Sequence, residues 1–147
     1  MRSIYDKGVV ESLQQRLAQL RADTRPRWGK FTAPQMLAHV NDQMRMTLGE
    51  LPVKFRDRPF QYTPLKQLII YVLPFPKGAP TAPELIARID VAEFNRERES
   101  FATLARRVAA SRGSRFPLHP AFGTLSPTAW GVLGYKHTDH HFRQFGV

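Results

Sequence analysis

The chain has 147 residues, of which 42% are hydrophobic and 23% charged, so it can form one domain with a substantial core and is not a disordered protein. It contains no cysteine, which excludes disulfides, thiolate metal ligands and a cysteine nucleophile. The net charge of +10 would suit nucleic acid, an acidic membrane surface or an anionic substrate.

The basic residues are scattered and interleaved with acidic ones, without a long basic run or a recognisable nucleic-acid motif. This distribution favours a basic, solvated surface over a nucleic-acid interface. The segment Met1–Lys7 lacks the apolar region of an export signal, and the longest apolar run, Leu68–Leu73, is too short to cross a bilayer. We therefore predict a cytoplasmic protein that does not enter the membrane.

The first predicted helix runs from Tyr5 to about Ala22. Its apolar residues recur every three or four positions, with polar residues between them. The stripe consists of Val10, Leu13, Leu17 and Leu20. We expect this helix only to pack against the core.

A second helix is predicted to begin at Thr32. Thr32 and Gln35 have the spacing of a capping box, and Pro34 lies in the first turn, where a missing N–H is tolerated. His39 lies at the border of the apolar face, so its position alone indicates a half-exposed boundary histidine. The apolar face itself consists of Met36, Leu37, Val40, Met44 and Leu48.

Residues Leu51–Pro83 contain seven of the twelve prolines, which excludes long regular helices. One short helix, about Leu65–Leu73, fits between two of these prolines. We predict that the rest is a stiff crossover joining the second and third long helices, without a domain boundary, so that residues 1–147 form a single domain. Its aromatic residues suggest that it packs as a cover; they are Phe55, Phe60, Tyr62 and Phe75.

The third long helix is predicted from Val91 to about Ser111. Its apolar positions follow helical spacing, and its charged residues, Glu97 among them, are expected on the outer faces. A loop, Phe116–Gly123, follows and contains His119, which is flanked by an apolar residue and a proline.

The last helix is predicted from Ser126, as the N-cap, to Gly146, with Pro127 at its first position. His137 and His141 lie four residues apart on a face that is otherwise apolar. Residues with this spacing have Cβ atoms about 5–6 Å apart and can chelate one metal ion. Spacing alone leaves open whether they do so or are core histidines bonded to carbonyls or carboxylates.

No strand pattern competes with these helices, because alternation is brief and hairpin turns are lacking. The predicted fold is all-α, a four-helix bundle with a long Pro-rich crossover between helices 2 and 3.

Four segments, in this order along the chain, resemble a DinB-like family of uncharacterised bacterial proteins. They are Trp28–Val40, Pro74–Glu84, His119–Gly123 and Tyr135–Gly146. The resemblance implies a four-helix bundle of the DinB/YfiT-like superfamily. Many members of that superfamily bind a divalent metal through one histidine of the second helix and an His-x-x-x-His pair of the last.

Carried over to this sequence, the resemblance implies a histidine triad of His39, His137 and His141. Two alternatives stay open: His140 could replace His141 if the helix is rotated, and His119 could complete a tetrahedral site. Asp139 points away from the histidine face and is expected to be a surface charge or a partner of a neighbouring element.

Three imidazoles leave a coordination position open, and both Zn²⁺ and Ni²⁺ suit them. Some members of the superfamily are transferases that use a low-molecular-weight thiol, so the resemblance implies such a thiol and a small-molecule substrate. The alternatives are a metal-dependent hydrolase and a non-enzymatic stress-response or binding protein. A hydrolase needs a general base, for which Glu50, Asp42 and Asp139 are the candidates.

Bundles of this kind often pair through a helix face. A homodimer contact through Phe142 and Phe55 is therefore a further expectation.

Overall fold

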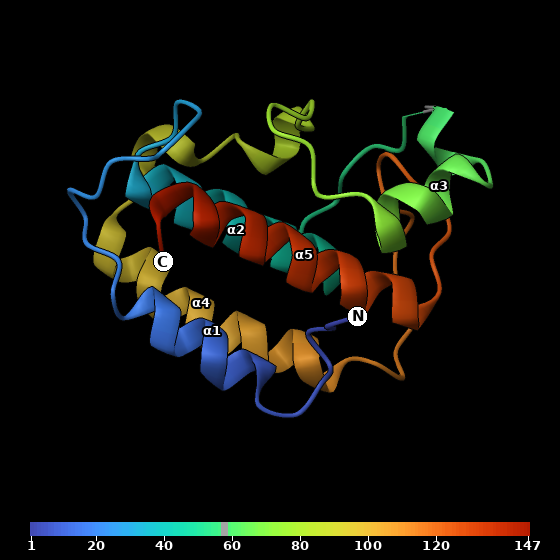
Figure 1. The fold of residues 1–147 in the computed structure, drawn as a ribbon, viewed down its shortest axis with the longest axis horizontal. Helices are drawn as coiled ribbons and strands as arrows, with labels where there is room; N and C mark the ends of the chain where they lie inside the picture. The colour runs from blue at the N-terminus through green and yellow to red at the C-terminus, as the bar shows by residue number, and fades with distance from the viewer. Residues whose placement is uncertain (57–58) are drawn as a thin grey trace.

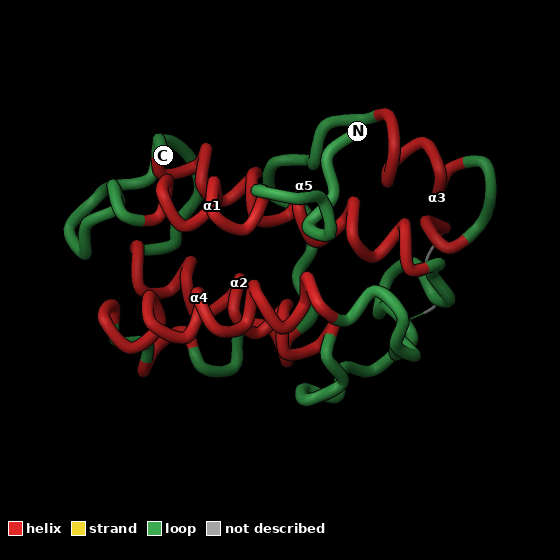
Figure 2. Tube along the Cα trace, turned by 90° about the horizontal axis from the view of Figure 1, so that it is seen from below, coloured by secondary structure: helices red, strands yellow, loops and turns green. Residues whose placement is uncertain are grey.

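The computed structural model describes residues 1–56 and 59–147, and this part of the chain is built of helices without a β-strand (Figure 1). The four long helices are α1 (Val9–Leu17), α2 (Ala33–Thr47), α4 (Phe94–Ala110) and α5 (Pro127–Phe145). Both α2 and α1 contact α4 and α5. In Figure 2, α1 accordingly lies beside α5 in one layer, and α2 beside α4 in the other. The all-α prediction is confirmed.

The ends of α2 and α5 follow local sequence signals. The Thr32 hydroxyl accepts a hydrogen bond from the Gln35 backbone N–H, and the Gln35 side chain accepts one from the Thr32 N–H, which is the predicted capping box. The Ser126 hydroxyl caps α5, and Gly146 ends it with a φ of 81°, a left-handed conformation that glycine adopts without strain. Both predicted helices are confirmed.

The other two long helices are shorter than predicted. Gly8 has a φ of 79° and breaks the helical path immediately before α1, so this helix begins at Val9 rather than Tyr5. α4 begins at Phe94, because Glu93 is extended and the preceding residues Ile89–Val91 form a separate 3-10 turn, η4.

The main core fills the space between the four long helices. Phe142 of α5 is fully buried there, with its ring centre 5.4 Å from that of Phe101 of α4. The expectation that Phe142 contributes to a homodimer contact is therefore wrong. Glu97, expected on an outer face of α4, is also buried, because it pairs with Arg88.

The crossover begins with the 3-10 turn η1 (Pro59–Gln61). Its short predicted helix is present as α3 (Leu65–Gln67), which continues as a π-helical turn, η2 (Leu68–Val72). A second 3-10 turn, η3 (Pro83–Leu85), follows. In Figure 1 the crossover passes along α2 and α5, on the side opposite α1 and α4.

Lys136 of α5 ties the crossover to that helix. Its Nζ donates to the carbonyls of Ile69 and Ile70 at 2.6 and 3.1 Å. A second apolar cluster forms where the crossover meets α2 and α5, with Met46, Ile70, Leu85, Phe122, Leu125, Ala129, Trp130, Val132 and Leu133 as its buried members.

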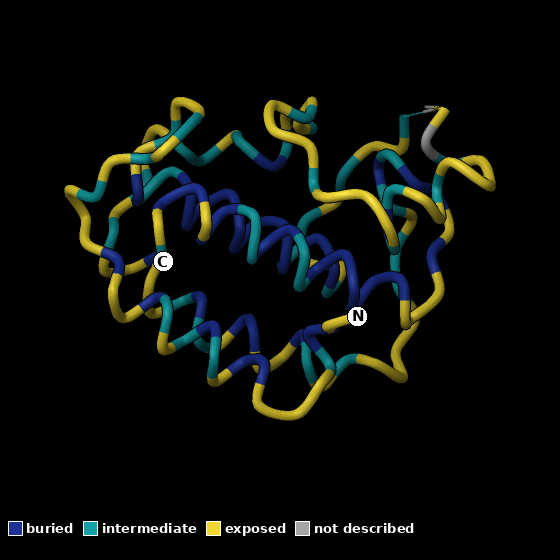
Figure 3. Tube along the Cα trace, viewed as in Figure 1, coloured by how far each residue is buried: buried dark blue, intermediate teal, exposed yellow. Residues whose placement is uncertain are grey.

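The prediction of an aromatic cover holds for only part of the crossover. Phe75 packs against histidines of α5, whereas Phe55 and Tyr62 are 42% and 61% exposed. The side chain of Phe60 lies outside the described residues. Figure 3 shows that much of the crossover surface is exposed, in contrast to the buried faces of α2 and α5. None of the helices described is long and apolar enough to cross a membrane.

Candidate metal centre

The fold brings together His39 of α2 with His137 and His141 of α5. Each residue offers one ring nitrogen, and these three atoms all lie within 4.8 Å of one another. The three residues are only 3%, 8% and 7% exposed. His39 is thus not the half-exposed histidine that its position alone indicated, because the crossover covers this side of α2.

Two of the three rings have a fixed tautomer. His39 Nδ1 lies 3.0 Å from the Leu85 carbonyl oxygen, which can only accept, so Nδ1–H donates and Nε2 carries the lone pair. His141 Nδ1 lies 2.9 Å from Gln144 Oε1. Because Gln144 Nε2 donates to the Trp28 carbonyl at 2.7 Å, its Oε1 is the acceptor and His141 Nδ1–H the donor. His141 Nε2 is therefore also left with its lone pair.

Protein-bound metals usually have histidine ligands arranged in this way, with the second ring N–H donating to a carbonyl or carboxylate. Neither of these two hydrogen-bond partners was expected from the sequence. Gln144 could have been found, since it lies three residues after His141 on the same side of α5. The Leu85 carbonyl carries no sequence signal.

His137 is less well satisfied. Its Nε2 lies 3.0 Å from His39 Nε2, and its buried Nδ1 has no hydrogen-bond partner among the residues that the structure describes. Leaving a buried polar atom unpaired costs about 1–3 kcal/mol. The three imidazoles by themselves are therefore an incomplete hydrogen-bonding arrangement.

The distance between His39 Nε2 and His137 Nε2 suits a shared ion. Two nitrogens that are each about 2.1 Å from one zinc ion lie about 3 Å apart at a right angle and about 3.4 Å apart at the tetrahedral angle. The observed 3.0 Å falls at the lower end of this range. The residues present therefore fit a divalent metal ion.

The electrostatic environment keeps the rings neutral. Burial lowers the pKa of His39, lowers that of His141 to about 3, and lowers that of His137 well below its ordinary value, with a further contribution from the neighbouring histidines. At pH 7 all three rings are in the protonation state that a metal ion requires.

Aromatic rings enclose the triad. The Phe31 ring centre lies 5.5 Å from that of His39 and 6.1 Å from that of His141, while Phe75 lies 5.5 Å from His137. His140 packs between Phe75 and Trp28 at the edge of this enclosure and is not part of the group of converging nitrogens.

His119 also lies outside that group. Its Nδ1 accepts hydrogen bonds from the backbone N–H groups of Ala121 and Phe122, both at 3.2 Å, and its ring packs against Trp130. This histidine holds the loop that precedes α5.

A family model described as "Protein of unknown function (DUF1569)" matches residues 9–146. The chain belongs to this family. Searches of curated proteins and of solved structures give no match. The DUF1569 match includes all three histidines, but its description assigns no function, and nothing in it links the chain to the DinB-like superfamily.

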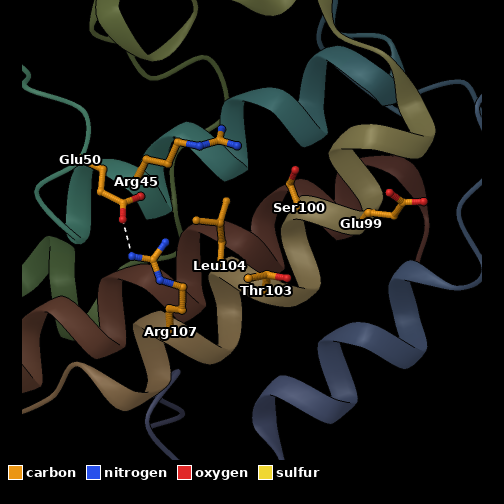
Figure 4. A pocket seen from close by; sticks show the side chains of 7 residues that line it. All are labelled: Arg45, Glu50, Glu99, Ser100, Thr103, Leu104 and Arg107. Atoms are coloured by element: carbon orange, nitrogen blue, oxygen red, sulfur yellow. Dashed lines mark hydrogen bonds and ion pairs between the residues drawn. The ribbon is translucent and has the colours of Figure 1, made fainter.

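The three carboxylates considered as general bases in this DUF1569 chain are all paired with arginines. Asp42 binds Arg45 and Arg88. Glu50 binds Arg107 across a surface pocket of about 400 Å³ between α2 and α4 (Figure 4).

Asp139 binds Arg16 of α1 at 2.7 Å, as well as Arg143 of its own helix. The expectation that it partners a neighbouring element is confirmed.

Proposed function

We propose that the protein binds one divalent metal ion, zinc or nickel, through His39, His137 and His141. The observation that carries this proposal is the pair of rings whose Nδ1–H groups are held by Leu85 and Gln144, so that the Nε2 atoms of His39 and His141 carry lone pairs beside His137. Imidazole nitrogen suits both metals.

We also propose that the fold is a four-helix bundle of the DinB-like type. The closed ring of contacts α1–α4–α2–α5 supports this assignment, as does the crossover between the second and third long helices. Both features agree with what the resemblance implies.

The proposed activity is that of a transferase using a low-molecular-weight thiol. An ion held by three protein ligands keeps a position open, where it would lower the pKa of a bound thiol or water. The chain has no cysteine of its own, so the sulfur would come from the cosubstrate. Phe31 and Phe75 would exclude water. Lys77, whose Nζ lies 4.3 Å from the Trp28 ring centre and whose charge acts on His140, is a nearby cation that would bind a thiol's carboxylate.

Two alternatives have different support. A hydrolase is less well supported, because all three candidate bases are paired with arginines. A structural metal site without activity is favoured by one observation, the deep burial of the triad.

Metal content tests the site. Untagged wild type, reconstituted with Zn²⁺ or Ni²⁺, is expected to carry about one equivalent by mass spectrometry, and His39→Ala and His137→Ala are expected to carry none. His140→Ala is the matched control, because it removes a neighbouring imidazole from the same helix and should retain the metal. A wild type without metal, or a His140→Ala protein that loses it, contradicts the assignment.

The visible spectrum of the Co²⁺-substituted protein distinguishes an open from a closed site. Adding a low-molecular-weight thiol should produce a sulfur-to-cobalt charge-transfer band. If the metal is bound but the thiol leaves the spectrum unchanged, the structural alternative is supported instead.

A further inference from the structure

Two buried carboxylates from different helices meet at one arginine of the crossover. Asp42 of α2 and Glu97 of α4 have side chains only 2% and 3% exposed. Arg88 donates from Nη2 to Asp42 at 2.9 Å and from Nη1 to Glu97 at 3.0 Å, and its Nε also binds Asp42. Asn41 donates a further hydrogen bond to Glu97 at 2.8 Å.

Arg88 contacts α2 about one helical turn beyond His39 of the metal centre. Arg88 follows Leu85 by three residues, just as Asp42 follows His39 by three. His39 and Asp42 lie on the same side of α2, one turn from each other, because they are three apart on one helix. Leu85 and Arg88 belong to the crossover, at the end of η3 and directly before η4. The crossover therefore docks on one face of α2 at two points: the Leu85 carbonyl accepts from His39 Nδ1–H, and Arg88 binds Asp42.

From this geometry we infer that Arg88 is a positioning residue for the metal centre. By binding Asp42 and Glu97 together, it holds the Leu85 carbonyl against His39 Nδ1 and so keeps the His39 Nε2 lone pair directed at the other two histidines. The inference rests on the proposed metal function.

The arrangement requires arginine specifically. A guanidinium offers several N–H donors in a rigid plane and can bind two carboxylates at once, whereas a lysine ammonium is a compact point charge. Although burial raises the pKa of Glu97, the hydrogen bonds from Arg88 and Asn41 hold it below its ordinary value. The charge of Arg88 and the planar arrangement of its N–H donors can therefore be tested separately.

Arg88→Lys keeps the positive charge but loses the planar set of N–H donors that binds both carboxylates. Its zinc affinity, measured by competition with a chromophoric chelator, is expected to be about 10-fold or more weaker than that of wild type, the range found when a ligand's hydrogen-bond partner is lost. Arg56→Lys is the matched control. Arg56 binds Glu84 at 3.1 Å, next to Leu85, and the Lys54 carbonyl, so its guanidinium ties one part of the crossover to another and zinc affinity should be unchanged.

A second readout does not require metal. In the metal-free protein, ¹⁵N NMR of the His39 ring should show Nδ1 protonated in wild type and in Arg56→Lys. In Arg88→Lys it should show a mixture of both tautomers. A general loss of stability would not produce this change.

The outcomes separate the two proposals. If wild type binds no zinc, the proposed metal function fails, whatever the tautomer experiment shows. If wild type binds zinc and Arg88→Lys binds it equally tightly, the role of Arg88 is overturned.

Should Arg88→Lys fail to fold by circular dichroism, the double variant Arg88→Met/Glu97→Gln removes the unpaired buried charge and should show the same weakened zinc binding. If this double variant binds zinc as tightly as wild type, the inference is likewise overturned.

Discussion

At the scale of single residues, Gln144 makes two hydrogen bonds whose effects on the site can be tested separately. Its Oε1 accepts from His141, and its Nε2 donates to the Trp28 carbonyl. The first bond holds the His141 Nδ1–H directly, and the second determines which atom of the Gln144 amide faces His141.

Replacing Gln144 by Leu removes the acceptor, and we expect zinc affinity to fall by about 10- to 100-fold. Replacing it by Glu keeps an acceptor for His141 Nδ1–H while losing the donor to Trp28, so zinc affinity should be retained. Competition with a chelator measures both. Equal loss in the two variants would mean that the contact with Trp28, and not the hydrogen bond to His141, matters for the site.

His119 is expected to make stability depend on pH. Burial, together with nearby Lys66, lowers its pKa from the ordinary 6.5 to about 3. Between these values the unfolded chain binds a proton that the folded protein does not. The stabilisation is complete above pH 6.5 and is lost as the pH falls toward 3, by about 1.4 kcal/mol per pH unit for one such group.

His119→Asn should reduce this dependence, because its Oδ1 can still accept from the loop N–H groups but does not titrate. The free energy of unfolding of metal-free protein, measured with urea between pH 4 and pH 7, should depend on pH more steeply in wild type than in the variant. Identical slopes would show that His119 is accessible to protons in the folded state.

At the scale of elements, two glycines of α5 provide a matched comparison. A Cβ at Gly131 would lie 2.3 Å from both Ser3 Oγ and Tyr5 Cδ2, because the N-terminal segment packs directly on the helix there. A Cβ at Gly134 would meet only Ile4 Cγ2, at an ordinary 3.8 Å.

We therefore expect Gly131→Ala to destabilise the protein by about 1–3 kcal/mol through overpacking. Gly134→Ala should instead stabilise it by up to about 1 kcal/mol, since alanine favours a helix more than glycine does. Urea denaturation measures both changes. A stabilised Gly131→Ala protein would indicate that the N-terminal segment is not held against α5.

The ends and faces of helices are the part of the fold that the sequence could predict best. α2 and α5 were predicted well because their ends depend on adjacent residues, Thr32 with Gln35 and Ser126 with Pro127, and because His137 and His141 share a helix face. The start of α1 was missed because apolar periodicity does not register the left-handed backbone of Gly8.

The hydrogen-bond partners of the site are harder to predict. His39 is buried by a crossover that is distant in sequence, and its partner is a backbone carbonyl that any residue could supply. Glu97 was assigned to an outer face because charged residues usually are, and only the position of Arg88 explains its burial. Contacts of this kind depend on tertiary structure, which helical periodicity does not encode.

At the scale of the whole molecule, metal binding should appear as thermal stability. A ligand that binds only the folded state stabilises it by about 2.7 kcal/mol at 100 times its Kd. We expect Zn²⁺ to raise the Tm of wild type, a chelator to reverse the rise, and His137→Ala to show neither effect. A similar rise in the Tm of His137→Ala would mean that zinc bound elsewhere on the surface causes the stabilisation.

The two sides of the triad lie far apart in sequence: His39 and His137 are separated by 98 positions. An ion held by both would close a loop of that size, and a covalent cross-link of about 100 residues removes unfolded-chain entropy worth about 4.7 kcal/mol in the simple loop model. The chain has no cysteine with which to make such a link. Under the proposed function the metal would take the place of a disulfide, as a cross-link that forms without an oxidant and that acid or a chelator can undo.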